Sequence, residues 1–277
     1  MIRKQIFCIL YLVACMASAQ APEKPVHDDS RKYKRPAYLS ISVGISSASF
    51  RDFATSPLRY SGRPLYLSLA HLDFDAKRTS SFHLAYSFGE YPNDFNDHQS
   101  VSKVRTLSMN YQELFQFKSI QSEQWNLQVG GQFNATANHR ENTLLQNNGE
   151  GVDIIATLFG SVQLTRYLKT KKAWKNNQLS YTFHAGLINS AYRNGFAYIN
   201  LSALLNNDAF FDDYHFELFA GFRLASALDY TFFLKNHNAL QVSYLWDAYH
   251  TGKDKGELEM ATHTLKFALL FNLNESK

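Results

Sequence analysis

Residues 264–273 read Thr-Leu-Lys-Phe-Ala-Leu-Leu-Phe-Asn-Leu, and their alternation decides the class of fold. Every odd-numbered position in this stretch is Leu or Phe, whereas the even-numbered positions include Thr264, Lys266 and Asn272. Successive side chains of a β-strand point to opposite faces, so a period of two predicts a strand with one apolar face. The last strand is therefore expected to separate an apolar environment from a mixed one.

The same alternation recurs along the chain and predicts an all-β fold of about ten strands, with eight or twelve as alternatives. Each expected strand sets an apolar face against a face rich in Ser, Thr, Asn and Gln. The eighth keeps one parity from Phe216 to Leu234, with Ala220 on the apolar face and Phe219 on the other, so we expect a single long strand. The expected strands lie near residues 39–46, 64–74, 81–89, 105–117, 125–135, 153–165, 179–187, 216–234, 240–248 and 264–273.

The expected connections fall into two classes of length. Short ones lie near 75–79, 118–123, 168–177 and 235–238, and mostly longer ones near 47–62, 91–102, 138–150, 190–213 and 250–257. Bacterial membrane barrels have short periplasmic turns and long external loops, whereas a soluble β-sandwich has no reason to sort its loops in this way. A lipid-facing sheet must also close, because hydrocarbon offers no partner to an open strand edge. We therefore predict a transmembrane antiparallel up-and-down β-barrel over 37–273, with its N-terminus in the periplasm.

The first residues have the parts of a secretory signal. Arg3 and Lys4 precede an apolar run over 6–15, and Ala-Ser-Ala at 17–19 precedes Gln20. This pattern predicts a cleavable signal peptide over 1–19, cut between Ala19 and Gln20. Residues 12–15, Leu-Val-Ala-Cys, also fit a bacterial lipobox, so lipidation of Cys15 is the alternative. Residues 20–36 are polar with three prolines, which predicts a flexible leader, and 274–277 form a short tail.

The charge and cysteine content exclude several classes of function. Cleavage after Ala19 would remove both cysteines, Cys8 and Cys15, so the mature chain would have no disulfide or thiolate site. It would also take two of the 28 basic residues, leaving 26 against 24 acidic ones with no dense basic patch, so no nucleic-acid partner is expected. No His, Asp and Glu cluster has metal-ligand spacing, and no glycine-rich phosphate loop occurs, so neither a metal nor a cofactor is expected.

In these features the chain resembles the outer-membrane β-barrel proteins of Gram-negative bacteria. The cleavage site at 17–20 and the segment Thr-Ser-Pro-Leu-Arg-Tyr-Ser-Gly at 55–62 are similar to uncharacterised barrels of the Bacteroidota. The resemblance implies an integral protein of the outer membrane, in contact with outer-membrane lipid and inserted by the barrel-assembly machinery. It carries no motif that is specific for one function.

Two enzymatic interpretations find partial support in the sequence. Residues 73–75, Asp-Phe-Asp, and 213–215, Asp-Tyr-His, resemble the two halves of an omptin-type protease site, but the expected topology separates them by the membrane thickness of about 30 Å. A lipid hydrolase would need Ser and His on the lipid face, whereas His83 and His184, although near serines, take inward parity. No catalytic residue is therefore assigned.

The inward faces carry six expected lumen charges, two of which we expect to pair. A turn at 235–238 places Arg223 and Asp247 at matching heights on neighbouring strands, which predicts an ion pair. Ten strands with inward aromatic side chains leave a narrow passage at most. We expect a non-enzymatic binding or structural module that presents extracellular loops to a possible ligand or protein partner, with a narrow pore and a membrane-embedded lipid hydrolase as alternatives. The six expected lumen charges are Asp153, Glu217, Arg223, Asp229, Asp247 and Lys266.

Overall fold

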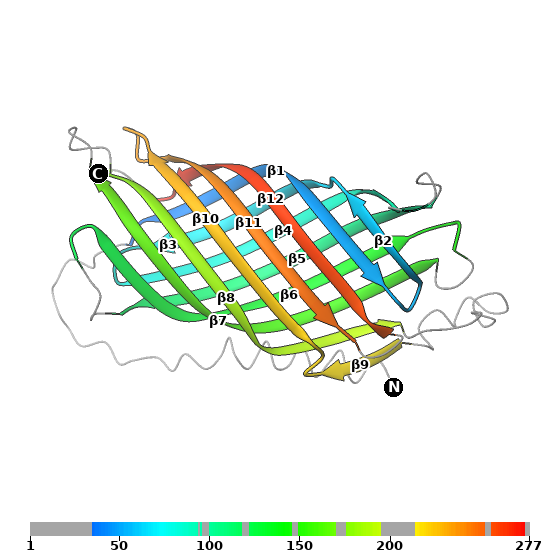
Figure 1. Ribbon diagram of the computed structural model, residues 1–277. Helices are drawn as coiled ribbons and strands as arrows, with labels where there is room; N and C mark the ends of the chain where they lie inside the picture. Colours follow the sequence, from blue (N-terminus) through cyan, green and yellow to red (C-terminus); the bar gives the residue numbers. More distant parts are fainter. Residues whose placement is uncertain are drawn as a thin grey trace. The chain divides into compact units, whose positions relative to one another are not determined.

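The computed structural model describes residues 35–93, 95, 100–117, 122–145, 149–169, 176–194, 214–252 and 256–274. These residues form one antiparallel sheet of twelve strands that closes into a barrel with oblique strands (Figure 1). No helix of the described residues is long and apolar enough to cross a membrane. The expected signal peptide, its cleavage site at Ala19 and Gln20, and nearly all of the expected leader lie outside the described residues.

Strands that follow one another along the chain pair in that order around the barrel, and pairing of β12 with β1 and of β10 with β8 closes the ring. Leu39, near the start of β1, lies opposite Phe271, near the end of β12, so the strand at 264–273 pairs with the first strand of the barrel. The strands are β1 (Ala37–Asp52), β2 (Ser56–Gly62), β3 (Leu65–Phe74), β4 (Arg78–Pro92), β5 (Val101–Gln116), β6 (Trp125–Glu141), β7 (Glu150–Lys169), β8 (Asn176–Asn194), β9 (Tyr214–Leu218), β10 (Phe222–Phe233), β11 (Ala239–Thr251) and β12 (Leu258–Asn272).

Two of the twelve strands extend others, so the wall is ten strands around. β2 and β3 pair with β1 in the same register from Arg59 to Asp73, with a gap at Arg63-Pro64, where Pro64 has no N–H to donate. The register of β2 shifts near the turn, between Arg51 and Asp52. β9 likewise continues β10, because both pair with β8. The predicted antiparallel up-and-down barrel of about ten strands is therefore confirmed.

The expected outer loop near 47–62 is wrong, because the strands continue through it. β1 runs to Asp52, a turn occupies 53–55, and β2 returns from Ser56. The outward residues beyond Ile45 are Ser47, Ser49 and Arg51. The apolar alternation therefore stops at Ile45 although the strand does not. In the same way β6 extends into the expected loop 138–150 and β8 into the expected loop 190–213.

The expected single strand over 216–234 is also wrong. Phe219 and Gly221 have φ angles of 57° and 74°, which end β9 and start β10. Ala220, expected to face outward, is buried and donates its N–H to the Asn189 carbonyl at 3.0 Å. Phe219, expected to face inward, is 66% exposed. Because Leu218 and Phe222 both point outward, the break preserves the parity on either side and leaves no trace in the alternation.

A second irregularity lies in β8, where the register with β7 shifts between Leu158 and Phe159. Leu187 and Ile188 are consecutive and both exposed, so one residue of β8 is bulged out of the ladder. Beyond this bulge the odd-numbered residues of β8 face inward, as the burial of Ala191 and Arg193 shows. The bulge therefore reverses which face the last residues of β8 present.

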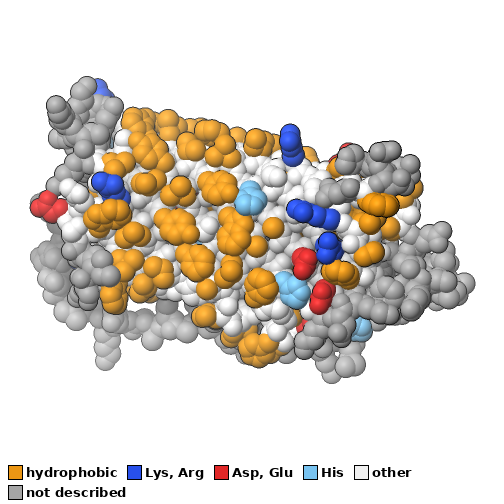
Figure 2. Space-filling view, viewed as in Figure 1, with side chains coloured by type: hydrophobic (Ala, Val, Ile, Leu, Met, Phe, Trp, Pro, Cys, Tyr) orange, Lys and Arg blue, Asp and Glu red, His pale blue; other side chains and the backbone are white. Residues whose placement is uncertain are grey.

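The barrel is apolar outside and mostly polar inside. Exposed Leu, Ile, Val, Phe, Tyr and Trp side chains cover the wall, whereas Ser, Thr, Asn and Gln predominate among the buried residues. Figure 2 shows the apolar side chains over the left and centre of the visible face and charged ones gathered towards its right-hand end. This is the inverse of a soluble protein, in which the apolar side chains lie inside.

The break between β9 and β10 gives a first test. A Cβ on Gly221 would lie 1.9 Å from the His250 carbonyl oxygen, and the residue also has a positive φ. We expect Gly221→Ala to lower the free energy of unfolding by about 1–3 kcal/mol. The temperature at which heat-modifiable gel mobility is lost should fall. Gly256→Ala, where a Cβ meets nothing within 4 Å, is the matched control and should leave that temperature unchanged.

Candidate functional site

The interior of the barrel is the candidate site, and it is packed in layers. The innermost layer is apolar: Tyr38 stacks on Phe74 with ring centroids 5.1 Å apart, and Phe233 lies 6.5 Å from Tyr38. Leu270, which the sequence places inside, is buried against them. These rings lie at the end where β1 begins and β12 ends. They fill that end of the described barrel, which we call the inner end, with apolar side chains.

Above this layer, three neighbouring strands form a polar row. Asp229 of β10 lies opposite Ser243 of β11, which lies opposite Lys266 of β12. Gly44 of β1 comes next, and a Cβ there would lie 2.9 Å from the Lys266 Cβ. The glycine therefore leaves room for the Lys266 side chain. The structure thus places two of the expected lumen charges, Asp229 and Lys266, in the same row.

Ser161 and His184 form a hydrogen bond at 2.7 Å between Ser Oγ and His Nδ1. Both residues are buried in the interior, and the His184 ring packs edge-on against Phe159 at 5.9 Å. The pair joins β7 to β8 inside the wall and does not face lipid.

Arg223 contacts Asp247, as the turn at 235–238 predicts. Arg223 donates from Nε and Nη2 to the two carboxylate oxygens of Asp247, at 3.0 and 2.6 Å. It also crosses the interior to β6, where it donates to Asn134 and, at 3.2 Å, to Thr136. Its guanidinium lies 5.1 Å from the centroid of the Tyr249 ring. One side chain therefore links β10, β11 and β6 across the lumen.

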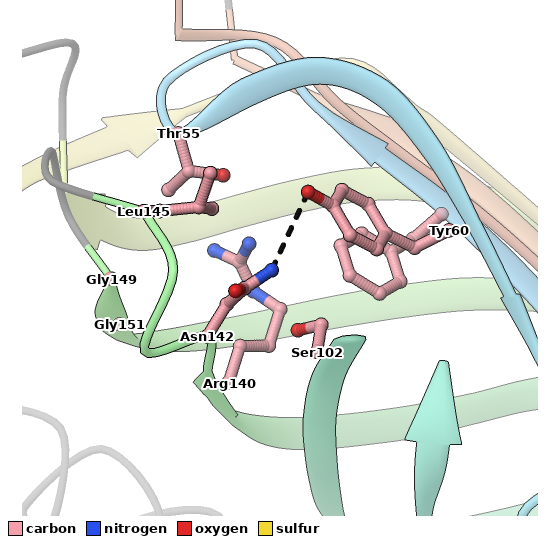
Figure 3. Close-up of a pocket in the computed structure, with 9 residues that line it drawn as sticks. Thr55, Tyr60, Ser102, Arg140, Asn142, Leu145, Gly149 and Gly151 are labelled. Carbon is pink, nitrogen blue, oxygen red and sulfur yellow. Dashed lines mark hydrogen bonds between the residues drawn. The ribbon is translucent and has the colours of Figure 1, made fainter. Parts of the chain in front are cut away.

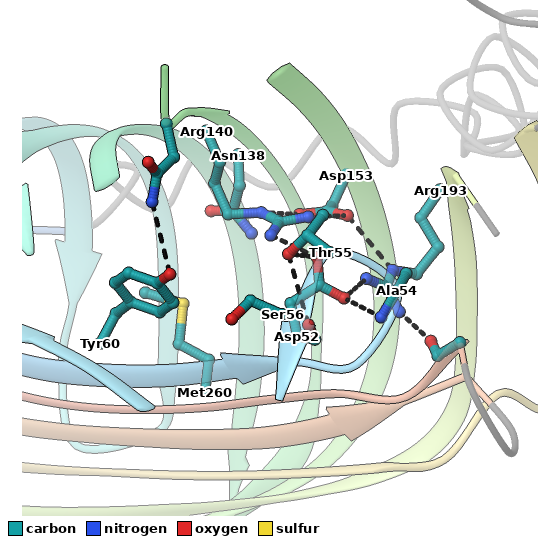
Figure 4. A network of polar contacts seen from close by, with 12 residues as sticks. Asp52, Ala54, Thr55, Ser56, Tyr60, Asn138, Arg140, Asp153, Arg193 and Met260 are labelled. Carbon is teal, nitrogen blue, oxygen red and sulfur yellow. Dashed lines mark hydrogen bonds and ion pairs between the residues drawn. The ribbon is translucent and has the colours of Figure 1, made fainter. Parts of the chain in front are cut away.

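The opposite end of the barrel, which we call the outer mouth, is crossed by a closed ring of four buried charges, the mouth ring: Asp52, Arg140, Asp153 and Arg193 (Figure 4). Each arginine contacts both aspartates. Arg140 donates to Asp52 and, at 2.8 and 3.1 Å, to Asp153; Arg193 donates to Asp52 at 2.6 Å and to Asp153 at 3.2 Å. The side chains are at most 7% exposed. Two positive and two negative charges make the mouth ring neutral.

Asp52 is the member that makes the mouth ring span the barrel. Arg140, Asp153 and Arg193 come from the adjacent strands β6, β7 and β8, whereas Asp52 ends β1 on the opposite side. Its carboxylate also accepts the Ala54 N–H at 3.1 Å and the Thr55 hydroxyl at 3.2 Å, which holds the turn after β1. The turn and the mouth ring therefore stabilise each other.

Asp52 lies beyond Ile45, where the apolar exterior of β1 ends. Its partners determine the pKa of its carboxyl. Burial alone would raise the pKa of its carboxyl. The charges of Arg140 and Arg193 and their hydrogen bonds outweigh that effect and hold the pKa below its ordinary value. Asp52 is therefore ionised at neutral pH, and the mouth ring is an ionic contact.

A small pocket opens beside the mouth ring (Figure 3). Arg140 and Asn142 form one side, and Asn142 donates to the Tyr60 hydroxyl at 3.4 Å. Gly151 lines the pocket too. A Cβ at this position would lie 3.5 Å from both Arg140 Nη2 and Asn194 Oδ1. The Asn194 amide is buried without a hydrogen-bond partner. The pocket is small, and Arg140 of the mouth ring lies in its lining together with the buried rings of Phe50 and Tyr60.

Sequence reasoning assigned only Asp153 of the mouth ring to the interior. Asp52 and Arg140 lie in strand extensions that were expected to be loops, yet both continue the inward parity of their strands. Reading that parity onward would have found them. Arg193 follows the bulge in β8, so the regular alternation assigns it to the wrong face. Glu217, the last expected lumen charge, pairs in register with Ala191 near the mouth, and its Oε2 has no hydrogen-bond partner.

The two halves of the protease-like pattern do not meet. Asp73 pairs with Ala37 at the inner end of β1, and His215 pairs with Arg193 at the outer end of β8; Asp213 lies outside the described residues. In the described part of the chain, no group of three or more His, Cys, Asp or Glu residues could hold a metal ion. Among the residues that the structure describes, the geometry therefore brings together interior ion pairs and does not join the two halves of this pattern.

The mouth ring can be tested by removing its cross-barrel member. Asp52→Ala leaves two buried guanidinium groups with one carboxylate between them, so we expect a loss of about 3–5 kcal/mol of unfolding free energy. The loss should appear as a lower thermal midpoint by circular dichroism in detergent micelles. Glu259→Ala removes an exposed carboxylate at the outer end of β12 and is the control. If both substitutions lowered the thermal midpoint by the same small amount, the mouth ring would not stabilise the barrel.

The Arg223–Asp247 pair gives a second test. Arg223→Ala leaves the Asp247 carboxylate, whose side chain is 35% exposed, without its partner, and removes the link to β6. Solvent screening reduces the cost, so we expect about 2–3 kcal/mol. The temperature at which heat-modifiable gel mobility is lost should fall accordingly. Substitution of the exposed Arg105 by Ala is the control. Unchanged mobility in Arg223→Ala would show that the pair does not hold the barrel.

Comparisons with known proteins find solved structures that are similar to this chain at low sequence identity. No protein-family model matches the chain, and no curated protein sequence matches it. The translocator domain of the autotransporter NalP from Neisseria meningitidis is 7% identical, with a TM-score of 0.45 over 87% of this chain and 90% of that one. The transport unit of the autotransporter AIDA-I from Escherichia coli is 8% identical, with a TM-score of 0.46 over 90% and 93%. Ail of Yersinia pestis is 10% identical, with a TM-score of 0.30 over 86% and 100%. Similarities of this size carry no information about function.

Proposed function

We propose that this protein is an integral outer-membrane β-barrel that acts as a closed, non-enzymatic scaffold. Its N-terminus lies in the periplasm, and the outer ends of its strands hold loops at the cell surface for binding a ligand or a protein partner. The observation that carries the proposal is the mouth ring, which ties β1 to β6, β7 and β8 across the lumen. Outer-membrane lipid and the barrel-assembly machinery are the partners that such a protein requires.

The exterior supports the membrane setting. Phe267 is 58% exposed and Val162 is 45% exposed, and such side chains cover the barrel between its two ends. An apolar surface of this extent is unfavourable in water and favourable in lipid. The closed ring of strands satisfies the backbone N–H and C=O groups that hydrocarbon would leave without partners.

The layered interior supports a scaffold over the alternative of a pore. An ion would have to displace the mouth ring, the Arg223 link and the apolar layer around Tyr38 in succession. Each layer would have to repack, and packed interiors resist such rearrangement. A lipid hydrolase is less well supported, because the Ser161–His184 pair is buried in the lumen and no lipid can reach it from the wall.

The first test concerns location and orientation. An epitope tag inserted at 145–149, between β6 and β7, should be cut by proteinase K on intact cells. The same tag at 235–237, between β10 and β11, should be cut only after the outer membrane is permeabilised. The opposite result would reverse the orientation, and recovery of the protein in the soluble periplasmic fraction would refute the membrane location.

The second test concerns the lumen. In planar lipid bilayers we expect the purified protein to give no discrete conductance steps. Asp52→Ala should give none either, because the apolar layer around Tyr38 and Leu270 stays in place. Discrete steps in the unaltered protein that change in amplitude with Asp52→Ala would favour the pore instead.

A further inference from the structure

The apolar belt on the outside of the barrel differs in height around the wall. On β7 the outward residues are apolar or glycine from Val152 to Leu164, which is roughly 40 Å of strand at about 3.3 Å per residue. On β3 the outward apolar run extends only from Leu65 to Leu69, roughly 13 Å. A tilted membrane strand needs about 9–11 residues to cross the hydrocarbon. β7 meets this requirement, and β3 falls well short of it.

The short belt is bounded by charge at its outer edge. Beyond Leu65, Phe88 and Leu107, the next outward residues are Arg63, which lies just before β3, Glu90 of β4 and Arg105 of β5. Arg63 and Arg105 are exposed. Hydrocarbon is therefore excluded from the wall immediately above these three apolar side chains.

At the inner edge the same strands carry a hydrogen-bonded polar cluster on the outer face of the wall. Glu113 of β5 forms an ion pair with Arg78 of β4 and accepts hydrogen bonds from the Ser80 and Tyr111 hydroxyls, both at 2.9 Å. The Arg78 side chain is 42% exposed. The carboxylate is thus satisfied by side chains of the wall itself, on the face that should contact lipid.

The cluster continues onto β3. Asp73 is opposite Ser80 in the strand pairing, and Arg35 lies 3.7 Å from the Asp73 carboxylate. Arg35 also donates to Ser80 at 3.4 Å, and His71, half-exposed, lies 4.0 Å from Asp73. Arg35, His71, Asp73, Arg78, Ser80, Tyr111 and Glu113 together form what we name the wall cluster.

A full-thickness bilayer could not lie against this wall without burying the wall cluster. A cationic side chain on the lipid face costs about 2–4 kcal/mol at the bilayer midplane and about 0–1 kcal/mol near the interface. Thinning of the bilayer costs only fractions of a kcal/mol per Å of mismatch. The lower total cost is reached when the headgroups move up to the wall cluster.

We propose that the β3–β4–β5 wall locally thins the bilayer and draws phospholipid headgroups up to the wall cluster. The exposed guanidinium of Arg78, together with Arg35, meets the lipid phosphates there, and phosphate is the group that a guanidinium binds best. The opposite wall, around β7 and β8, holds a bilayer of ordinary thickness. This inference rests on the proposed membrane location.

The test compares two positions at the same distance from the inner strand ends. His71 is the fourth residue from the inner end of β3, and Leu179 is the fourth residue of β8; both point outward. A nitroxide label is attached to H71C and, separately, to L179C, both lacking residues 1–19 and so free of native cysteine. The full barrels are placed in vesicles of phosphatidylethanolamine and phosphatidylglycerol. Collision rates with a water-soluble nickel chelate and with oxygen are then measured by electron paramagnetic resonance.

We expect collisions with the nickel chelate to be several-fold more frequent for H71C than for L179C, and the oxygen collisions to show the reverse. Low nickel accessibility at both positions would overturn the thinning proposal while leaving the membrane location intact. High nickel accessibility at both would overturn the membrane location itself, so the two failures are distinguishable. If H71C is accessible in vesicles but protected from a membrane-impermeant thiol reagent in permeabilised cell envelopes, a protein and not lipid covers the wall cluster, and the proposal fails.

A second variant makes the inference independent of labelling. H71L/R78L/S80L/E113L removes both members of the ion pair together and lengthens the apolar belt. When acyl chains are lengthened from vesicle to vesicle, the thermal midpoint of the unaltered barrel should fall more steeply than that of this variant. Equal slopes would contradict a thinned bilayer at this wall.

Discussion

Backbone hydrogen bonding is the constraint on which the rest of this structure depends. Hydrocarbon supplies no donor or acceptor, so each strand must find its partners in its two neighbours, and the last strand must pair with the first. Pairing of β12 with β1 over the whole length of both strands meets this condition. Once the ring is closed, the period of two sends one side chain outward and the next inward. The apolar exterior and the polar interior therefore have one cause.

The interior then has to be filled by polar side chains, and the arrangement found here keeps its charge balanced. Each buried carboxylate of the mouth ring contacts two guanidinium groups, and each guanidinium contacts two carboxylates. When one contact of such a ring lengthens, each of the two charges involved keeps its other partner. The apolar rings around Tyr38 close the other end without any charge. A lumen closed by two unrelated kinds of contact is hard to open by one change.

The amino-acid sequence predicts the regular part of this fold and fails at its irregular parts. Alternation identifies the strands, the closed wall and the Arg223–Asp247 pair, because all three follow from the period of two and short turns. It cannot show that Phe219 turns outward, because two left-handed residues restore the parity within a few positions. It assigns Arg193 to the wrong face, because a bulge in β8 adds a residue that no local signal marks. Of the four members of the mouth ring, only Arg193 was therefore beyond prediction.

The same irregularities shape the outside of the barrel. The bulge exposes Leu187 beside Ile188, and the break between β9 and β10 exposes Phe219 beside Leu218, so both add apolar surface to the wall that already has the longest apolar runs. Apart from Arg35, which precedes β1, the polar wall cluster lies on β3, β4 and β5, well away from these two irregularities along the sheet. One side of the barrel is thus built to contact more hydrocarbon and another side less. If the barrel is the closed scaffold proposed above, this asymmetry makes the outer wall, together with the loops, a surface through which it can act.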